Sequence, residues 1–175
     1  SARWRSSAPD PMELVVANRE MVDAWRSAIA RERNLFEVRR EGGESDWRTV
    51  SGTAPFDWNA PPALAGAKRF FLPPRETLFR WQGDAIEDVD VGGEPMALFG
   101  LRSCDLTAIA YQDRFFAGDA WYCRRRSRAL LVGQDCLAAC AGGFCRDVDA
   151  GPFAHGGFDA NLTALDDGRV LIHFA

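Results

Sequence analysis

The sequence predicts an α/β domain with a mixed sheet, built around a parallel strand–helix–strand unit at about 95–134 and finished by terminal hairpins. Two continuous apolar runs, PMALFGL (95–101) and RALLVGQ (128–134), are typical of strands buried on both faces. Between them, DLTAIAYQDRFFA (105–117) has apolar residues at helical spacing. Because such a connection places its two strands parallel, we expect the two apolar runs to be neighbours in one sheet.

The other elements follow from local signals. Asn18 can cap a helix over about 19–32, in which the apolar residues recur on one face. Glycine-containing turns predict two hairpins, one over 35–50 and one formed by FDANLTAL and RVLIHF near the carboxyl end. Residues 51–67 are expected to form a connector. The aromatic segment 69–81 contains two prolines, which excludes it from the centre of a sheet.

Length and composition limit the domain organisation and the partners. We expect residues 1–11 to be a flexible arm or an expression scar, and 12–175 to be one α/β domain with a small helix–hairpin subregion at 12–50. A net charge of −4 gives no basis for binding nucleic acid, and the basic run RRRSR (124–128) is expected to be a solvated turn before a strand. No segment has the length of a membrane span or the pattern of a signal peptide, so we expect a cytoplasmic protein.

The chemistry of the chain is concentrated in its cysteines. Cys104 follows the first buried strand and Cys136 follows the second, so both are expected at the edge where open α/β sheets bind ligands. Cys104 also lies near a helix start, which favours a thiolate. Cys140 and Cys145 continue the pattern C-x3-C-x4-C among small residues. Cys123 has no thiol neighbour in the sequence, and we interpret it as a packing residue.

Packing, a disulfide, a nucleophile and a metal centre are the possible roles for this cysteine group. A disulfide scaffold is normally shorter and poorer in core residues, and clustered thiols in a cytosolic protein indicate metal or redox chemistry. A nucleophile needs a base, and the two histidines are better explained as a loop residue (His155) and a strand residue (His173). Four thiolates suit either zinc or an iron–sulfur cube, and the spacing matches neither the common zinc knuckles nor the bacterial ferredoxin motif. Both metals stay open, with the cluster slightly favoured.

Several phrases of the sequence together resemble a known family. They run from Lys68 to Leu165: KRFFLPPRETLFRW, GLRSCDL, YQDRFF, YCRRR, FCRDVDAGP and GGFDANLTAL. They are similar to the N-terminal part of the beta subunits of sulfhydrogenase-type nickel–iron hydrogenases and of the corresponding iron–sulfur subunit in anaerobic sulfite reductase. Ser103 replaces a proline of that family, and Gly143-Phe144-Cys145 stands where some relatives have Cys-Phe-Cys, so Cys140 is expected to replace the missing ligand.

The resemblance implies an electron-transfer domain of a multisubunit oxidoreductase that is not catalytic alone. It implies a [4Fe-4S] cluster held by Cys104, Cys136, Cys140 and Cys145, whose negative charge Arg102 and the arginines Arg124, Arg125 and Arg126 would offset. The expected partners are other subunits of a redox complex and a ferredoxin-like domain or subunit. Relatives continue into such a domain, whereas this chain ends at Ala175.

Two alternatives remain beside this hypothesis. The chain can instead be a docking module without redox chemistry, in which zinc or bare thiols fix the loop 136–145 and the aromatic segment 69–81 binds a partner subunit. The third is a flavin site, because related hydrogenase subunits pair clusters with flavin. The sequence has no G-x-G-x-x-G motif, and its Gly-Gly pairs are too generic to indicate a nucleotide.

Overall fold

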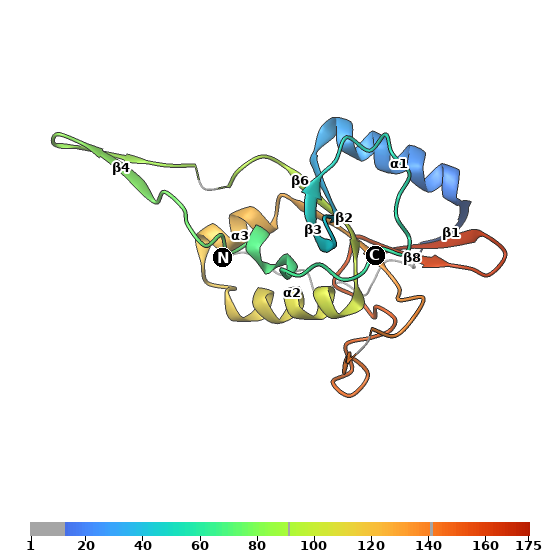
Figure 1. The fold of residues 1–175 in the computed structure, drawn as a ribbon. Helices are drawn as coiled ribbons and strands as arrows, with labels where there is room; N and C mark the ends of the chain where they lie inside the picture. The colour runs from blue at the N-terminus through green and yellow to red at the C-terminus, as the bar shows by residue number, and fades with distance from the viewer. Residues whose placement is uncertain (1–12, 91, 141) are drawn as a thin grey trace.

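A seven-stranded mixed sheet forms the centre of the computed structural model, which describes residues 13–90, 92–140 and 142–175 (Figure 1). The strand order is β1-β9-β8-β7-β6-β2-β3. The inner pairs β2–β6, β6–β7 and β7–β8 are parallel, and the outer pairs are antiparallel. The predicted α/β class with hairpins at the ends is therefore confirmed. The strands are β1 (Glu13–Asn18), β2 (Asn34–Glu41), β3 (Glu44–Thr49), β6 (Met96–Leu101), β7 (Ala129–Gln134), β8 (Ala160–Ala164) and β9 (Arg169–Phe174).

Helices cover both faces of this sheet. Helix α1 (Arg19–Glu32) packs on one face, where Val22 and Ile29 join the inward residues of the strands. On the other face lie α2 (Ser103–Phe115), α3 (Ala120–Arg126) and the 3₁₀ helix η1 (Ala67–Phe70) (Figure 1). Each face therefore has its own apolar core, as expected for a layered α/β fold.

The first helix begins where its capping signal predicts. The Asn18 side chain accepts a hydrogen bond of 2.8 Å from the Met21 N–H, and α1 covers the predicted range 19–32. Its most buried polar residue, Arg26, was not anticipated. The guanidinium donates to both carboxylate oxygens of Glu37 on β2, at 2.7 and 2.9 Å, and also to the Gly52 carbonyl. Both side chains are fully buried, so this pair joins the helix to the sheet through an ionic contact.

The strand–helix–strand unit is confirmed, but its connection holds a second helix. Strand β6 is buried along its whole length and lies parallel to β7. The interpretation of 124–128 as a solvated turn was wrong, because these residues include the end of α3. In α3, Arg125 is buried and donates to the Phe71 carbonyl at 2.7 Å. This contact fixes the segment after η1 to the helical layer.

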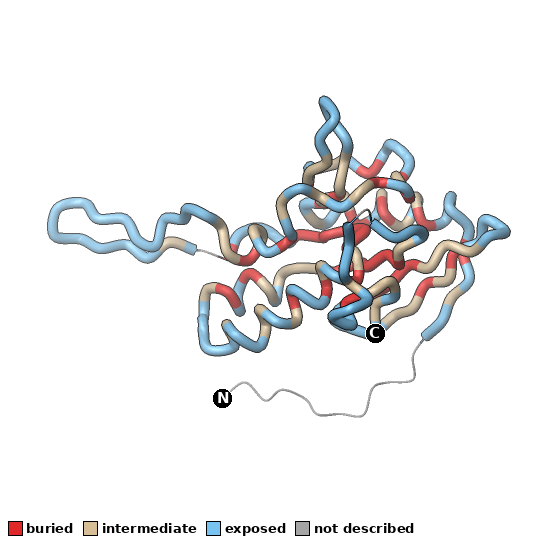
Figure 2. Tube along the Cα trace, turned by 60° about the horizontal axis from the view of Figure 1, so that its bottom comes forward, coloured by how far each residue is buried: buried red, intermediate tan, exposed pale blue. Residues whose placement is uncertain are grey.

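The aromatic segment 69–81 is divided between the core and the surface. Phe71 is fully buried beneath α2 and α3, whereas Phe79 and Trp81 belong to a separate two-stranded sheet. That sheet pairs β4 (Phe79–Gln82) with β5 (Ala85–Asp88) and extends away from the rest of the molecule (Figures 1 and 2). The prediction that this segment is not a central strand is therefore confirmed.

Two further observations concern the limits of the fold. The predicted arm 1–11 lies outside the described residues. Among the helices of the described residues, none combines the length and apolar character that crossing a membrane requires.

Candidate metal centre

Cys104 and Cys136 lie at the same edge of the sheet, as predicted. Leu101 of β6 pairs with Gly133 of β7, and each cysteine follows its strand by the same three residues. Cys104 is the second residue of α2, and Cys136 follows the buried Asp135 just beyond β7. The parallel register of the two central strands is therefore what brings these two thiols to one place.

The chain between Cys136 and β8 folds back over the start of α2. The Cys136 N–H donates to the Pro152 carbonyl at 3.1 Å, and the Ser103 hydroxyl donates to the Phe153 carbonyl at 2.8 Å. Gly151 lies between them. A Cβ at this position would be 3.4 Å from the Cys145 sulfur and 3.7 Å from the Ser103 Cβ. Cys145 is thus held beside the helix start that carries Cys104.

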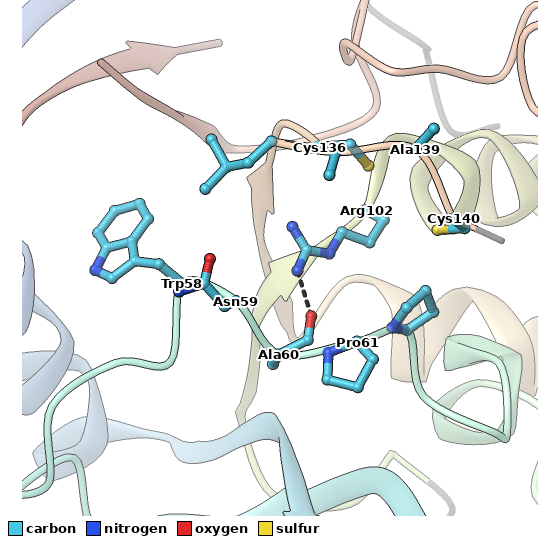
Figure 3. Close-up of a pocket in the computed structure, with 11 residues that line it drawn as sticks. Trp58, Asn59, Ala60, Pro61, Arg102, Cys136, Ala139 and Cys140 are labelled. Atoms are coloured by element: carbon cyan, nitrogen blue, oxygen red, sulfur yellow. Dashed lines mark hydrogen bonds between the residues drawn. The ribbon is translucent and has the colours of Figure 1, made fainter. Parts of the chain in front are cut away.

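Cys140 lies on a tight turn at the mouth of a cleft. The Gly143 N–H donates to the Cys140 carbonyl at 3.0 Å, and Gly142 has a positive φ of 72°. The cleft has a volume of about 570 Å³, and Cys136, Cys140 and Arg102 line it together with the segment 58–62 (Figure 3). The connector predicted from its composition therefore forms one wall of the candidate site.

Arg102 is fixed at this cleft by backbone contacts. Its guanidinium donates to the Ala60 carbonyl at 2.6 Å, and its N–H donates to the Asp105 carboxylate at 3.2 Å, closing the first turn of α2 (Figure 3). The neighbouring wall is held in the same manner, because the Gln134 side chain donates to the Trp58 carbonyl at 2.9 Å. A positive charge is thereby presented to the thiols by a rigid support.

Electrostatics show that the thiols influence one another. Burial, followed by the negative charges of Asp105, Cys136 and Cys145, raises the pKa of the Cys104 thiol to about 11. Burial also raises the pKa of Cys136; the Arg102 guanidinium opposes this shift, whereas Cys140 and Cys145 add to it. The helix start was expected to favour a thiolate at Cys104, and that expectation was wrong because burial and negative neighbours outweigh the helix dipole. A bound cation would reverse this balance.

The donor set suits a thiolate-ligated group in chemistry, but the thiols are not drawn together. All five cysteines are free, and four of them lie around one cleft edge. Within the described ranges, no three Cys, His, Asp or Glu side chains are gathered closely enough to hold a metal ion as they stand. Cys140 and Cys145 belong to a loop that contains Gly142 and Gly143, so the flexible half of the donor set is the half that has to move.

Asp135 is a site residue that the sequence did not reveal. Its buried carboxylate accepts hydrogen bonds from the Asn161 amide (3.0 Å), the Thr163 hydroxyl (2.5 Å) and the Ala154 N–H (3.0 Å). It therefore joins the end of β7, strand β8 and the returning loop at the position just before Cys136. An acidic residue that ends a buried strand was the available signal, but its partners come from residues 19 to 28 positions away.

The other arginines of the predicted site are not brought to the thiols. Arg124, Arg125 and Arg126 precede β7, whereas Cys136 follows it, and a six-residue strand is about 20 Å long. Each has a carboxylate nearby: Asp90 lies 3.7 Å from Arg124, Glu76 binds Arg125, and Asp113 lies 3.1 Å from Arg126. Only Arg102, of the four predicted arginines, lines the cleft.

The remaining candidates occupy ordinary positions. Cys123 lies on α3, where its thiol faces the Phe116 and Ala117 carbonyls. His155 is exposed in the returning loop, and His173 packs edge-on against Phe158 at a centroid distance of 5.1 Å. These positions agree with the interpretations made from the sequence.

Fold and cleft together define a mixed α/β domain that collects cysteines at the carboxyl edge of its parallel strands. Comparison with known proteins then gives a particular relative. Over 109 residues the chain is 37% identical to sulfhydrogenase 2 subunit beta of Pyrococcus furiosus, a match covering 59% of this chain and 31% of that protein. The resemblance to sulfhydrogenase beta subunits is confirmed, and the matched region is a sulfhydrogenase beta subunit-like domain. No family model and no solved structure matches the chain.

Proposed function

We propose that this chain is an electron-transfer domain of a multisubunit oxidoreductase, of hydrogenase or sulfite-reductase type. In this proposal Cys104, Cys136, Cys140 and Cys145 hold one [4Fe-4S] cluster, which supplies one-electron transfer when bound. The supporting observation is the convergence of these thiols at one cleft edge beside Arg102, in a domain similar to part of a sulfhydrogenase. A cytoplasmic location belongs to the same proposal, because all five thiols are free.

The residues of this chain have distinct roles in the proposed site. Cys104 and Cys136 are held by the sheet and α2, so they provide fixed ligands. Cys140 and Cys145 are carried on the glycine-containing loop, which closes when the cluster binds. Arg102 offsets the negative charge of a thiolate-bound cluster, and Asp135 positions the backbone before Cys136.

The test is anaerobic reconstitution of the full chain with iron and sulfide. We expect about four irons and four sulfides per chain and a broad absorption band in the blue region. Cys104→Ser and Cys136→Ser should leave the circular dichroism of the fold unchanged and abolish cluster binding, and Cys140→Ser and Cys145→Ser should also reduce iron content. Cys123→Ser is the matched control and should keep full iron content.

Two results of the same metal analysis contradict the proposal. Loss of iron in Cys123→Ser with retention in Cys140→Ser would mean that the ligand assignment is wrong. One zinc and no iron per chain after anaerobic preparation would instead support a docking module whose thiols serve structure.

A further inference from the structure

The two-stranded sheet β4–β5, with its turn and flanking residues 77–90, forms an arm that no other described element covers. Figures 1 and 2 show it extending from the body of the molecule, and every residue of both strands is exposed. Gly83, with a positive φ of 61°, makes the turn at its tip. An isolated two-stranded hairpin is at best marginally stable in water, so this arm has little structural support of its own.

One face of the arm is apolar. Strand alternation places Phe79 and Trp81 on the same face, and Trp81 pairs directly with Ile86 across the ribbon. These side chains are 57%, 75% and 71% exposed, respectively. On the opposite face Arg80 pairs with Glu87. The arm is therefore amphipathic, and a concentrated aromatic surface of this kind is characteristic of protein interaction sites.

The base of the arm is held by the arginines of α3. Arg125, which is buried, binds the Glu76 carboxylate before β4 and the Phe71 carbonyl. After β5, the Asp90 carboxylate lies 3.7 Å from both Arg124 and Arg128. Both strands of the arm thus leave the body at points fixed by ion pairs, and the ribbon is presented outward instead of folding back.

The charge of the arm selects its occupant. Between Arg80 and Arg102 the chain has no Lys or Arg, and its carboxylates there are Asp84, Glu87, Asp88, Asp90 and Glu94. Asp88 shares the apolar face with Phe79, its pairing partner. A second copy would bring an equally acidic ribbon and be repelled, whereas an apolar cleft rimmed by Lys and Arg would complement both features.

We infer that the β4–β5 arm docks this chain onto a different protein subunit, into an apolar cleft bordered by basic residues. Trp81, Phe79 and Ile86 provide the buried contact, and the carboxylates of the tip pair with the basic rim. The inference identifies the partner surface for the proposed redox complex, and it does not depend on cluster binding.

The test uses the full tagged chain, purified together with its partner subunits from the organism that encodes it. We expect amide exchange at residues 78–89 to slow at least about tenfold in the complex relative to the isolated chain. The double variant Trp81→Ser/Ile86→Ser should lower the complex yield about tenfold or more. Asp84→Lys/Asp88→Lys should also weaken assembly. Tyr111→Ser/Phe115→Ser, which changes exposed aromatics on α2, is the matched control and should assemble normally.

Measurements on the isolated variants separate this inference from the proposed function. Trp81→Ser/Ile86→Ser should keep the thermal midpoint and the reconstituted iron content of the parent chain, so a loss of iron cannot imitate a loss of docking. Normal assembly of this variant, or unchanged exchange at 78–89 in the complex, would overturn the inference. So would a dimer of the isolated chain that these substitutions dissociate, because the occupant would then be a second copy.

Discussion

Residues that share a charge sign or a chemical type separate in this structure according to the element that carries them. Cys104, Cys136 and Arg102 were predicted at the strand ends, and they lie there because position after a parallel strand determines the edge. Arg124 and Arg125 were grouped with them on charge alone, but they lie before β7 and bind Asp90 and Glu76. Asp135 was missed because its three donors come from distant residues, which no local pattern reveals.

The buried pair Arg26–Glu37 should be the most sensitive polar contact of the fold. Glu37→Gln leaves the guanidinium buried without its full countercharge, so we expect a loss of about 3–5 kcal/mol in the free energy of unfolding. Denaturant unfolding at neutral pH measures it. Asp167→Asn removes an exposed partner of Arg169 and should leave the unfolding midpoint unchanged. A similar response from both variants would contradict this assignment.

Asp46 should make acid stability depend on pH. Burial alone would raise the pKa of its carboxyl, but hydrogen bonds from the Trp47 N–H and Arg69, with the charges of Arg69 and Arg48, lower it overall. The carboxylate therefore stabilises the fold above the unfolded pKa of about 3.9, and this stabilisation is lost as the pH falls through the lower folded pKa.

The substitution Asp46→Asn isolates this contribution. We expect it to cost at most about 1 kcal/mol at pH 7, because the partners are partly solvated, and to cost almost nothing near about pH 3. Chemical unfolding of both proteins at the two pH values is the measurement. A difference that stays constant or grows on acidification would contradict the assignment.

At the scale of elements, local signals predicted well where they depend on the chain itself. Helix α1, with its Asn18 cap, and the two hairpins have such signals in their own residues. Helix α3 has only seven residues, and its burial of Tyr122 and Arg125 depends on packing against the segment after η1. The wall at 58–62 is held through backbone carbonyls, which accept hydrogen bonds whatever the side chain is.

Strand β6 ends in an irregularity that directs the chain toward the site. Gly100 has a φ of 82°, and the pairing with β7 shifts register between Phe99 and Leu101. A Cβ at Gly100 would lie 2.8 Å from the Phe56 ring. The first residue of the phrase GLRSCDL is therefore a glycine because both the backbone conformation and the space require it.

Gly100→Ala should affect stability and site together. We expect a loss of about 1–3 kcal/mol from the strained φ and the contact with Phe56, together with reduced iron content because Arg102 and Cys104 are displaced. Unfolding curves and iron analysis measure the two effects. Gly42→Ala has a similar φ of 60° with no atom within 4 Å of the added Cβ, so it should lose stability without losing iron. Equal iron loss in both would contradict a local effect.

At the scale of the whole molecule, the sheet separates two functions at its opposite edges. The carboxyl edge of the parallel strands carries the thiols and Arg102, whereas the arginines at the opposite edge hold the β4–β5 arm. The proposed electron transfer and the proposed docking therefore use different residues and can be tested separately. Sequence reasoning predicted the first edge from strand direction, while the arm became visible only when the chain was placed in three dimensions (Figures 1 and 2).

The most direct test of the central claim is cysteine alkylation, read peptide by peptide by mass spectrometry on the cluster-loaded and metal-free full chain. The account predicts that loading protects Cys104, Cys136, Cys140 and Cys145 together, while Cys123 reacts equally in both forms. Protection of Cys123, or continued reaction of any one of the four in the loaded chain, would contradict a single four-thiol centre at the strand ends.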